Sequence, residues 1–339
     1  MREKNMAKQY DTLDDVAMSH LAEVAMKRYA PSLQGKLTLL CRSENATYRL
    51  DAGGKRYAMR IHRENYHQRD EIACELAWLS ALSAEGIAVP QALGGVDGDV
   101  VQTVILADGT PRHVVLFHWI EGEMPTTEVD ARAFEQLGMI TARLHQHSRN
   151  WQQPAQFRRI VWDHQTMVGS DGHWGRWQDA PRLQATDHTV IEETLHQVGE
   201  ALDAYGKDSQ RYGLIHADLR LTNLLMFKGE TRVIDFDDCG FGWYLHDLAA
   251  AISFVEHHPR ADAWVAGWLR GYQRICPLTD ADMAVIPALL IQRRIQLMAW
   301  AGSHAQTEQA KSLGDNWSDH SVRLCRRYLE KASLPVGCD

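Results

Sequence analysis

The chain has 339 residues, of which 45% are hydrophobic and 24% are charged, an ordinary balance for a folded globular protein. This much apolar material excludes a mainly disordered chain, and 24 glycines with 10 prolines exclude a collagen-like repeat. The formal net charge of −8 disfavours a duplex nucleic-acid binder, which normally carries a basic surface. The length exceeds what one hydrophobic core usually supports, so we expect two lobes.

The sequence carries no pattern typical of a membrane or secreted protein. Its first residues are too polar for a signal peptide, and its apolar runs are too short to span a bilayer. The six cysteines are scattered without a C-x-x-C pair, which disfavours a zinc site or a disulfide framework. We therefore expect a cytoplasmic protein with no nucleic-acid or membrane partner, and its oligomeric state stays unknown.

The first third of the chain predicts a small antiparallel β-sheet with one helix inserted into it. Hydrophobic spacing indicates a leading helix over residues 14–29 and a second helix over residues 69–84, which ends before Val89-Pro90. Gly53-Gly54 supplies a tight turn between two of the strands. The expected strands are residues 37–42, 46–51, 55–61, 99–106 and 113–119.

The rest of the chain is mostly helical by pattern, with helices expected over residues 130–147 and 189–205 and again toward the C-terminus. Short strands interrupt this run between residues 214 and 236. We predict an α+β chain with an N-terminal lobe over residues 1–118 and a helical C-terminal lobe over residues 119–339. Because no Ser/Pro-rich spacer separates them, we expect the lobes to pack around a cleft.

The most informative segment combines a loop with a hairpin. Residues 224–227 and 232–236 are apolar, strand-like runs, and the four residues between them contain Gly229. Antiparallel pairing brings the start of one strand beside the end of the other, so Asn223 and Asp235 are expected to lie together. Asp218 precedes Asn223 by five residues.

These three side chains suit one kind of chemistry. An amide oxygen and a carboxylate are hard ligands of the type that Mg²⁺ prefers, and Mg²⁺ commonly also binds a substrate phosphate. A further carboxylate beside the metal can accept the proton of an attacking hydroxyl. This division of roles is that of the kinase pattern H-R-D-L-x-x-x-N followed by D-F-G.

The segment His216–Asn223, followed by Asp235-Phe236-Asp237, resembles the aminoglycoside phosphotransferase/choline kinase family of protein-kinase-like small-molecule kinases. The catalytic loop of that family usually reads H-G-D-x-x-x-x-N. The segment Gly242–Ala249 also matches the G-x-x-x-x-D-L-A of the family. The resemblance implies a bilobal kinase-like fold that holds ATP between its lobes, with Asp218 as catalytic base and with Asn223 and Asp235 as ligands of Mg²⁺. Asp247, in the second motif, is expected to bond backbone near the loop.

The resemblance also implies nucleotide contacts in the N-terminal lobe. Arg60 stands where the family pattern has the phosphate-clamping lysine, and its helix partner would be Glu75, with Glu71 as second choice. No G-x-G-x-x-G loop covers the phosphates, and no A-P-E segment is evident. Ser43 and Asn45 stand where that loop would be and could supply donors. The adenine would lie against Phe117, His118, Trp119 and Ile120.

The sequence thus predicts an ATP- and Mg²⁺-dependent phosphotransferase that transfers the γ-phosphate to a hydroxyl of a small, polar, amine-bearing molecule. Aminoglycosides, choline and homoserine are acceptors of related scaffolds, and the motif does not select among them. Two alternatives stay open. One is a protein Ser/Thr kinase on the same scaffold, and the other is a catalytically silent, nucleotide-binding pseudokinase.

Overall fold

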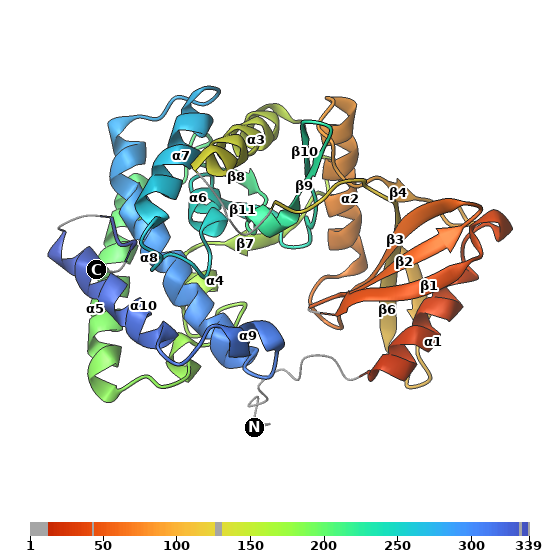
Figure 1. The fold of residues 1–339 in the computed structure, drawn as a ribbon, viewed down its shortest axis with the longest axis horizontal. Coiled ribbons are helices and arrows are strands. Elements are labelled where there is room, and N and C mark those ends of the chain that lie inside the picture. Colours follow the sequence, from red (N-terminus) through yellow and green to blue (C-terminus); the bar gives the residue numbers. More distant parts are fainter. Residues whose placement is uncertain (1–12, 43, 126–130, 332–333, 338–339) are drawn as a thin grey trace. The chain divides into compact units, whose positions relative to one another are not determined.

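The computed structural model describes residues 13–42, 44–125, 131–331 and 334–337 (Figure 1). Contacts within the chain divide it into two compact units. The first unit comprises the chain up to Gly122, together with residues 153–159 and 232–237. The second unit comprises residues 123–152, 160–231 and 238–339. The chain therefore returns twice to the first unit after leaving it.

The first unit is built on an antiparallel sheet in the order β1-β2-β3-β6-β4, and β5 also pairs with β6. All five predicted strands are present. The predicted strand over residues 99–106 is shorter than expected because the Asp97 and Asp99 carboxylates accept backbone N–H groups of Asp99 and Val101, which holds this stretch in a turn. The strands are β1 (Lys36–Arg42), β2 (Ala46–Ala52), β3 (Lys55–Ile61), β4 (Ala92–Leu93), β5 (Gln102–Ile105) and β6 (Pro111–His118).

Two helices accompany this sheet. Helix α1 (Asp15–Met26) packs an apolar face that includes Met18 and Leu21 into one cluster with sheet residues such as Leu50 and Met59. Helix α2 (Arg69–Ala84) begins and ends at the predicted residues. Its buried face also contains a carboxylate, Glu75, among leucines and isoleucine. A short 3-10 helix, η1 (Pro31–Leu33), follows α1.

The second unit is mostly helical, as predicted, and its longest described helix is α8 (Asp280–Ser303), which is buried along most of its length. A three-stranded sheet lies within the unit in the order β7-β11-β8, with β7 parallel and β8 antiparallel to β11. Its strands are β7 (Ile160–Trp162), β8 (Tyr212–Ile215) and β11 (Gly240–Trp243). The other elements are α3 (Ala131–Asn150), α4 (His164–Val168), η2 (Trp177–Asp179), α5 (Ala185–Tyr205), η3 (Leu221–Asn223), α6 (His246–Ala251), α7 (Ala261–Gln273), α9 (Glu308–Ser312) and α10 (Trp317–Glu330).

The predicted hairpin is present as β9 (Leu224–Phe227) and β10 (Glu230–Val233). The prediction of a four-residue connection was wrong, because Lys228 and Gly229 alone make the turn, with φ angles of 50° and 81°. Positive φ at both central residues is the signature of a type I′ turn, whose twist matches that of the strands. The second strand therefore begins earlier than expected and ends at Val233, and Asp235 follows it outside the ladder.

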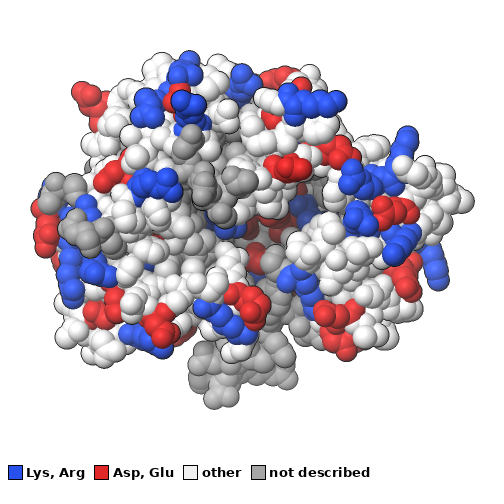
Figure 2. Space-filling view, viewed as in Figure 1, with Lys and Arg blue, Asp and Glu red and all other residues white. Residues whose placement is uncertain are grey.

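Charged side chains of both signs are interspersed over the face drawn in Figure 2. Among the helices that the structure describes, none is long and apolar enough to cross a membrane.

Helices α3 and α7 cross each other at glycines. A Cβ atom added to Gly138 on α3 would lie 2.0 Å from the carbonyl oxygen of Trp268, and one added to Gly271 on α7 would lie 1.9 Å from that of Glu135. Backbone therefore packs directly on backbone at this crossing, and no side chain there can turn away to make room.

We expect Gly271→Ala to lower the free energy of unfolding by about 1–3 kcal/mol, because the added methyl group forces the helices apart. Gly199→Ala in α5 is the matched control, since its Cβ would meet only the His164 ring at 3.4 Å. That control should be neutral or stabilising by up to ~1 kcal/mol, because alanine favours helix over glycine. Urea unfolding of the three proteins measures both effects, and equal stability of Gly271→Ala and wild type would contradict the close crossing.

Candidate active site

The loop over residues 216–223 leaves strand β8 and enters the 3-10 turn η3 before β9 begins. Strand β8 ends with Leu214 and Ile215, which are fully buried, so the start of the loop is fixed to the core of the second unit. Leu219 is also fully buried and anchors the middle of the loop. The polar residues between these anchors are therefore held in defined positions.

Asp247, near the start of α6, holds this loop in place through hydrogen bonds to its backbone. Its Oδ1 accepts a hydrogen bond from the backbone N–H of Ala217 at 2.7 Å, and its Oδ2 accepts one from that of His216 at 3.1 Å. Oδ2 also accepts from Nε2 of His145, whose Nδ1 lies 2.9 Å from the Tyr272 hydroxyl. Burial acts to raise the pKa of Asp247, but its hydrogen bond with His145 and the neighbouring His216 and His246 together outweigh burial and lower that pKa. The expectation that Asp247 bonds backbone near the loop is confirmed.

Ala217 has a φ angle of 67°, in the left-handed region that favours glycine. This conformation explains the glycine that the family pattern has at this position. An alanine there carries strain of about 1–2 kcal/mol, and the hydrogen bond from its N–H to the Asp247 carboxylate holds it in place.

Asp218 and Asn223 contact each other, as their spacing predicts. Nδ2 of Asn223 donates to the backbone carbonyl of Asp218 at 2.8 Å and to its Oδ2 at 3.2 Å. Nε of Arg220 donates to the same Oδ2 at 3.2 Å, and the N–H of Asp218 donates to Nδ1 of His216. The carboxylate is thus oriented by donors from its own loop.

Arg293 of α8 also contacts Asp218, which the sequence reasoning missed. Its Nη2 donates to Oδ1 of Asp218 at 2.8 Å. A signal was present, because Arg293 and Arg294 are consecutive charges in an otherwise apolar, buried helix. Buried charges need partners, although the sequence does not say which carboxylates supply them.

Asp235 belongs to the first unit, whereas Asp218 and Asn223 belong to the second. The structure therefore brings two of the three predicted side chains into contact, and the approach of Asp235 to them stays a prediction. Asp235 has a φ angle of 64°. Such a backbone conformation in a residue other than glycine is a form of strain that clusters at functional sites.

In the first unit, Arg60 of β3 and Glu75 of α2 form the predicted ion pair, with Nη2 of Arg60 at 2.6 and 2.7 Å from the two carboxylate oxygens. Glu71, the second choice, instead accepts the N–H of Gln68 and closes the capping box of α2. Burial acts to lower the pKa of Arg60, but the Glu75 and Asp237 carboxylates outweigh it and raise it. The guanidinium also lies over the Phe117 ring at 5.2 Å.

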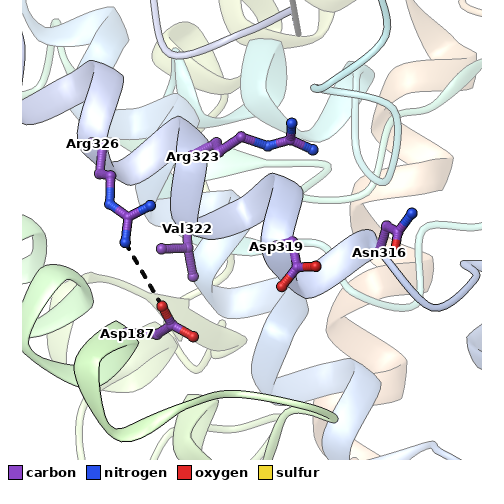
Figure 3. Close-up of a pocket in the computed structure, with 6 residues that line it drawn as sticks. All are labelled: Asp187, Asn316, Asp319, Val322, Arg323 and Arg326. Carbon is purple, nitrogen blue, oxygen red and sulfur yellow. Dashed lines mark ion pairs between the residues drawn. The ribbon is translucent and has the colours of Figure 1, made fainter.

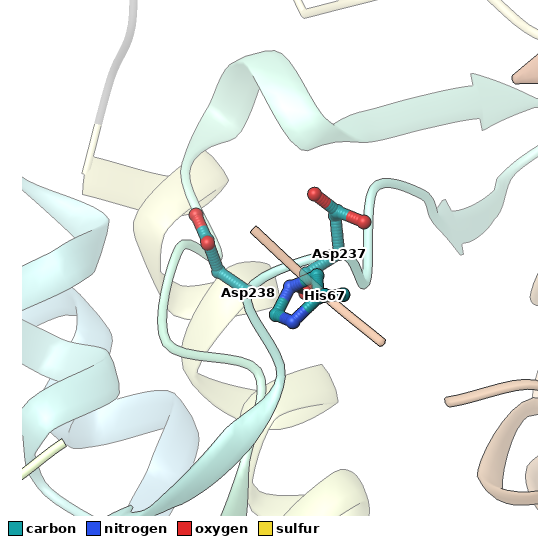
Figure 4. Close-up of side chains that lie close together, drawn as sticks. All are labelled: His67, Asp237 and Asp238. Atoms are coloured by element: carbon teal, nitrogen blue, oxygen red, sulfur yellow. Dashed lines mark hydrogen bonds between the residues drawn. The ribbon is translucent and has the colours of Figure 1, made fainter. Parts of the chain in front are cut away.

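Asp237, two residues after Asp235, is buried beside this pair. Its Oδ2 accepts from Nδ2 of Asn45 at 2.8 Å, and its Oδ1 lies 3.2 Å from Nδ1 of His62 and 4.0 Å from Nη2 of Arg60. Burial acts to raise its pKa, but Arg60 together with His62 and His67 holds that pKa well below the usual range. Figure 4 shows His67 next to Asp237, and Nε2 of His67 donates to its backbone carbonyl at 2.8 Å. These contacts tie the end of residues 232–237 to the sheet.

The residues predicted to lie against adenine sit at the end of β6. Phe117 is buried and pairs with Ala58 across the sheet, whereas His118 is exposed. Trp119 and Ile120 follow the strand, and the Arg56 guanidinium lies 5.2 Å from the Trp119 ring. Asn45 bonds Asp237 and the N–H of Arg63, and Ser43 lies outside the described residues.

A family model described as "Phosphotransferase enzyme family" matches residues 42–286, a range that includes both the Arg60–Glu75 pair and the 216–223 loop. The chain belongs to this phosphotransferase family.

Solved and curated relatives agree with this membership. The structure of a microcompartment-associated aminopropanol kinase is 41% identical, matches over 93% of this chain and 99% of that one, and superposes with a TM-score of 0.86. Amicoumacin kinase of Bacillus subtilis is 23% identical over 81% of this chain and 82% of its own. Homoserine kinase of Granulibacter bethesdensis is 25% identical over 73% of each chain.

These findings confirm three of the predictions: the family, the α+β kinase-like fold, and a phosphotransferase with a hydroxyl acceptor. They disfavour the protein-kinase alternative, because the relatives are named for small molecules.

The phosphotransferase also has a surface pocket at α10, shown in Figure 3. Both signs of charge line it, and Asp187 of α5 pairs with Arg326 at 3.9 Å. The opposed charges therefore compensate one another, and we assign no ligand to this pocket.

His246, which precedes Asp247, gives the stability of this phosphotransferase a pH dependence. Burial, assisted by the Arg293 charge, lowers the pKa of His246 from 6.5 to about 3. Between these values the unfolded chain binds a proton that the folded chain does not. We therefore expect the free energy of unfolding to fall as the pH is lowered from 6.5 toward 4, with this residue contributing a slope of up to about 1.4 kcal/mol per pH unit.

Urea unfolding of wild type and His246→Gln at several pH values measures this contribution. The stability curves of the two proteins should run parallel above pH 7, where histidine is neutral in both states, and the wild-type curve should fall more steeply than that of the variant below pH 6.5. Curves that stay parallel down to pH 4 would show that His246 takes up its proton in the folded protein.

Proposed function

We propose that this phosphotransferase is an ATP- and Mg²⁺-dependent kinase that transfers the γ-phosphate to the hydroxyl of a small amino alcohol, with Asp218 as its general base. The observation that carries this proposal is the contact between Asp218 and Asn223, in a loop whose backbone is hydrogen-bonded to Asp247. We assign nucleotide binding to residues 1–118 and the acceptor to residues 119–339.

Asp218 fits the role of base by its position and its partners. Its side chain is 15% exposed, and donors from its own loop and from α8 hold its carboxylate. An ionised carboxylate has about four acceptor positions. The donors from Asn223, Arg220 and Arg293 leave room for one more, which an acceptor hydroxyl can fill.

The chemistry of Asn223 suits a hard cation. Its Nδ2 is turned toward Asp218, and among the described residues its Oδ1 has no hydrogen-bond partner. An amide oxygen of this kind is a normal ligand of Mg²⁺. We propose that Asn223 and the strained Asp235 hold the ion, which supplies charge neutralisation at the phosphate oxygens when it is bound.

Arg60 would steady the phosphates. Its Nη2 is committed to Glu75 and its Nε to His62 at 3.3 Å. Within the described part of the chain, Nη1 has no hydrogen-bond partner and can donate to a phosphate oxygen. Ser43, Asn45 and the segment from Phe117 to Ile120 complete the proposed nucleotide contacts, and Trp119 offers an aromatic face to the adenine.

The class of acceptor is supported by the relatives. The 41% identical structure is that of an aminopropanol kinase, and homoserine kinases and a hydroxylysine kinase are among the curated relatives. These molecules share a hydroxyl and an amine on a short chain. The five described cysteines are free, which supports the cytoplasmic setting that we propose.

Purified protein with Mg²⁺-ATP and a panel of amino alcohols, with aminopropanol first and choline, homoserine and an aminoglycoside following, tests the proposal through ADP release. We expect turnover with a short amino alcohol, and Asp218→Asn should lower kcat by about 10²–10⁴-fold because the base is lost. Its affinity for ATP should change little, as measured by calorimetry. Binding of ATP with no transfer to any acceptor would favour the pseudokinase alternative.

Substitution of Arg60 tests the nucleotide contacts. Arg60→Met should raise the KM for ATP roughly 10–100-fold, because a charged hydrogen bond to phosphate is lost, while the KM for the acceptor stays close to that of wild type. Arg60→Lys, which restores a cation, should recover most of this loss. Lys55→Met is the control, since Lys55 is a cation at the exposed start of the same strand. An unchanged KM for ATP in Arg60→Met would remove Arg60 from the phosphate site.

A further inference from the structure

The middle of helix α8 carries two consecutive buried arginines, Arg293 and Arg294, each paired with a carboxylate. Arg294 pairs with Glu256, and both of these side chains are closed inside the core, with exposures of 0% and 1%. Arg293 is equally buried at 1%, but its partner Asp218 is 15% exposed. One pair is therefore fully enclosed, and the other includes a carboxylate residue that is partly exposed.

Three nitrogen atoms of Arg293 have three different partners. Nη2 donates to Oδ1 of Asp218 at 2.8 Å, Nε to Oγ of Ser253 at 2.9 Å, and Nη1 to Oε1 of Gln296 at 3.0 Å. The guanidinium also lies over the Trp174 ring, 4.7 Å from its centre. A planar group held at three points and on one face is fixed in orientation, and it fixes the carboxylate that it binds.

We propose that Arg293 is a positioning residue for Asp218, holding its carboxylate through Oδ1 and offsetting its charge so that an amino alcohol presents its hydroxyl, and not its ammonium group, to the base. This inference rests on the function proposed above, because it concerns the same carboxylate and the same class of acceptor.

The reason lies in the two donors that an amino alcohol carries. An ammonium group is a cation and binds a bare carboxylate more strongly than a neutral hydroxyl does. An acceptor bound through its ammonium would keep its hydroxyl away from the phosphate, which is a non-productive complex. Arg220 already occupies Oδ2, so the remaining acceptor position is on Oδ1, where the Arg293 charge lies. That charge repels a further cation at Oδ1 but leaves a hydroxyl free to bind.

Four variants separate this role from a purely structural one: Arg293→Met, Arg293→Lys, and the matched controls Arg294→Met and Arg294→Lys. The first should lower kcat for aminopropanol about 100-fold without raising its KM, because the base is misplaced while the ammonium gains a binding site. Arg293→Lys should recover kcat to within about tenfold of wild type, since it restores the charge but not all three contacts. The Arg294 variants should lose thermal stability and keep the kcat of the folded protein.

Propylamine, which has an ammonium group and no hydroxyl, tests directly whether the Arg293 charge keeps ammonium groups away from Asp218. It should inhibit Arg293→Met at a concentration at least about tenfold lower than it inhibits wild type, a difference of about 1.4 kcal/mol in binding. If Arg293→Met does not fold, Ser253→Ala replaces it in the test. This variant removes one hydrogen bond from Arg293 and leaves no unpaired buried charge, and it should lower kcat about tenfold.

Each result bears on one claim. Three results would overturn the role of Arg293 and leave the proposed function standing. They are an unchanged kcat in Arg293→Met or in Ser253→Ala, an equal loss of kcat in Arg293→Lys and Arg293→Met, and equal inhibition of Arg293→Met and wild type by propylamine. Absence of transfer to any amino alcohol by the wild type would overturn the proposed function and this inference with it.

Discussion

The Asp247 carboxylate is the acceptor on which the 216–223 loop depends. A fully buried charge is costly unless it is hydrogen-bonded, and this one receives two successive backbone N–H groups and the His145 imidazole. These bonds hold Ala217 in a conformation that alanine disfavours, and they therefore direct the chain into Asp218. The placement of the proposed base is thus fixed by a side chain 30 residues downstream of Ala217 and not by local propensity.

The two units each contain a buried arginine–carboxylate pair, but the partners have opposite roles. In the Arg60–Glu75 pair the carboxylate is fully enclosed, and it orients a cation that we propose contacts a phosphate through its remaining nitrogen. In the Arg293–Asp218 pair the cation is the enclosed partner, and its effect is to orient a carboxylate. The same kind of ion pair can therefore orient a cation in one unit and a carboxylate in the other.

Local patterns predicted helix α2 and five of the six strands of the first sheet, because these depend on residues close in sequence. The Arg60–Glu75 contact was predicted only from the resemblance to the family. These patterns did not predict β7 or β11, because strands of three and four residues are too short to show an alternation of apolar and polar residues. The apolar run around Phe236 suggested a strand through Asp235, whereas the ladder ends at Val233 and the backbone of Asp235 turns into the left-handed region.

Contacts between side chains that are distant in sequence were harder to predict. Asp237 reads as one of several acidic residues near the hairpin, and only the folded chain shows that Asn45, His62 and Arg60 surround it and make it a buried anchor. Arg293 likewise meets Asp218 across 75 residues. Periodicity can show that such charges lie on buried faces, but it cannot identify their partners.

The position of Arg293 in the chain also suggests how one chemistry serves many acceptors. The family model ends at residue 286, so Arg293 lies beyond the shared pattern, while Asp218 and Asn223 lie within it. Phosphoryl transfer requires a base and a metal-holding oxygen whatever the acceptor is, and we propose that Asp218 and Asn223 of the matched loop supply them. The surroundings of the proposed base come partly from α8, through Arg293, and partly from Trp174 and Ser253, which lie within the matched range. A fold of this kind separates the residues that perform the reaction from those that select what enters it.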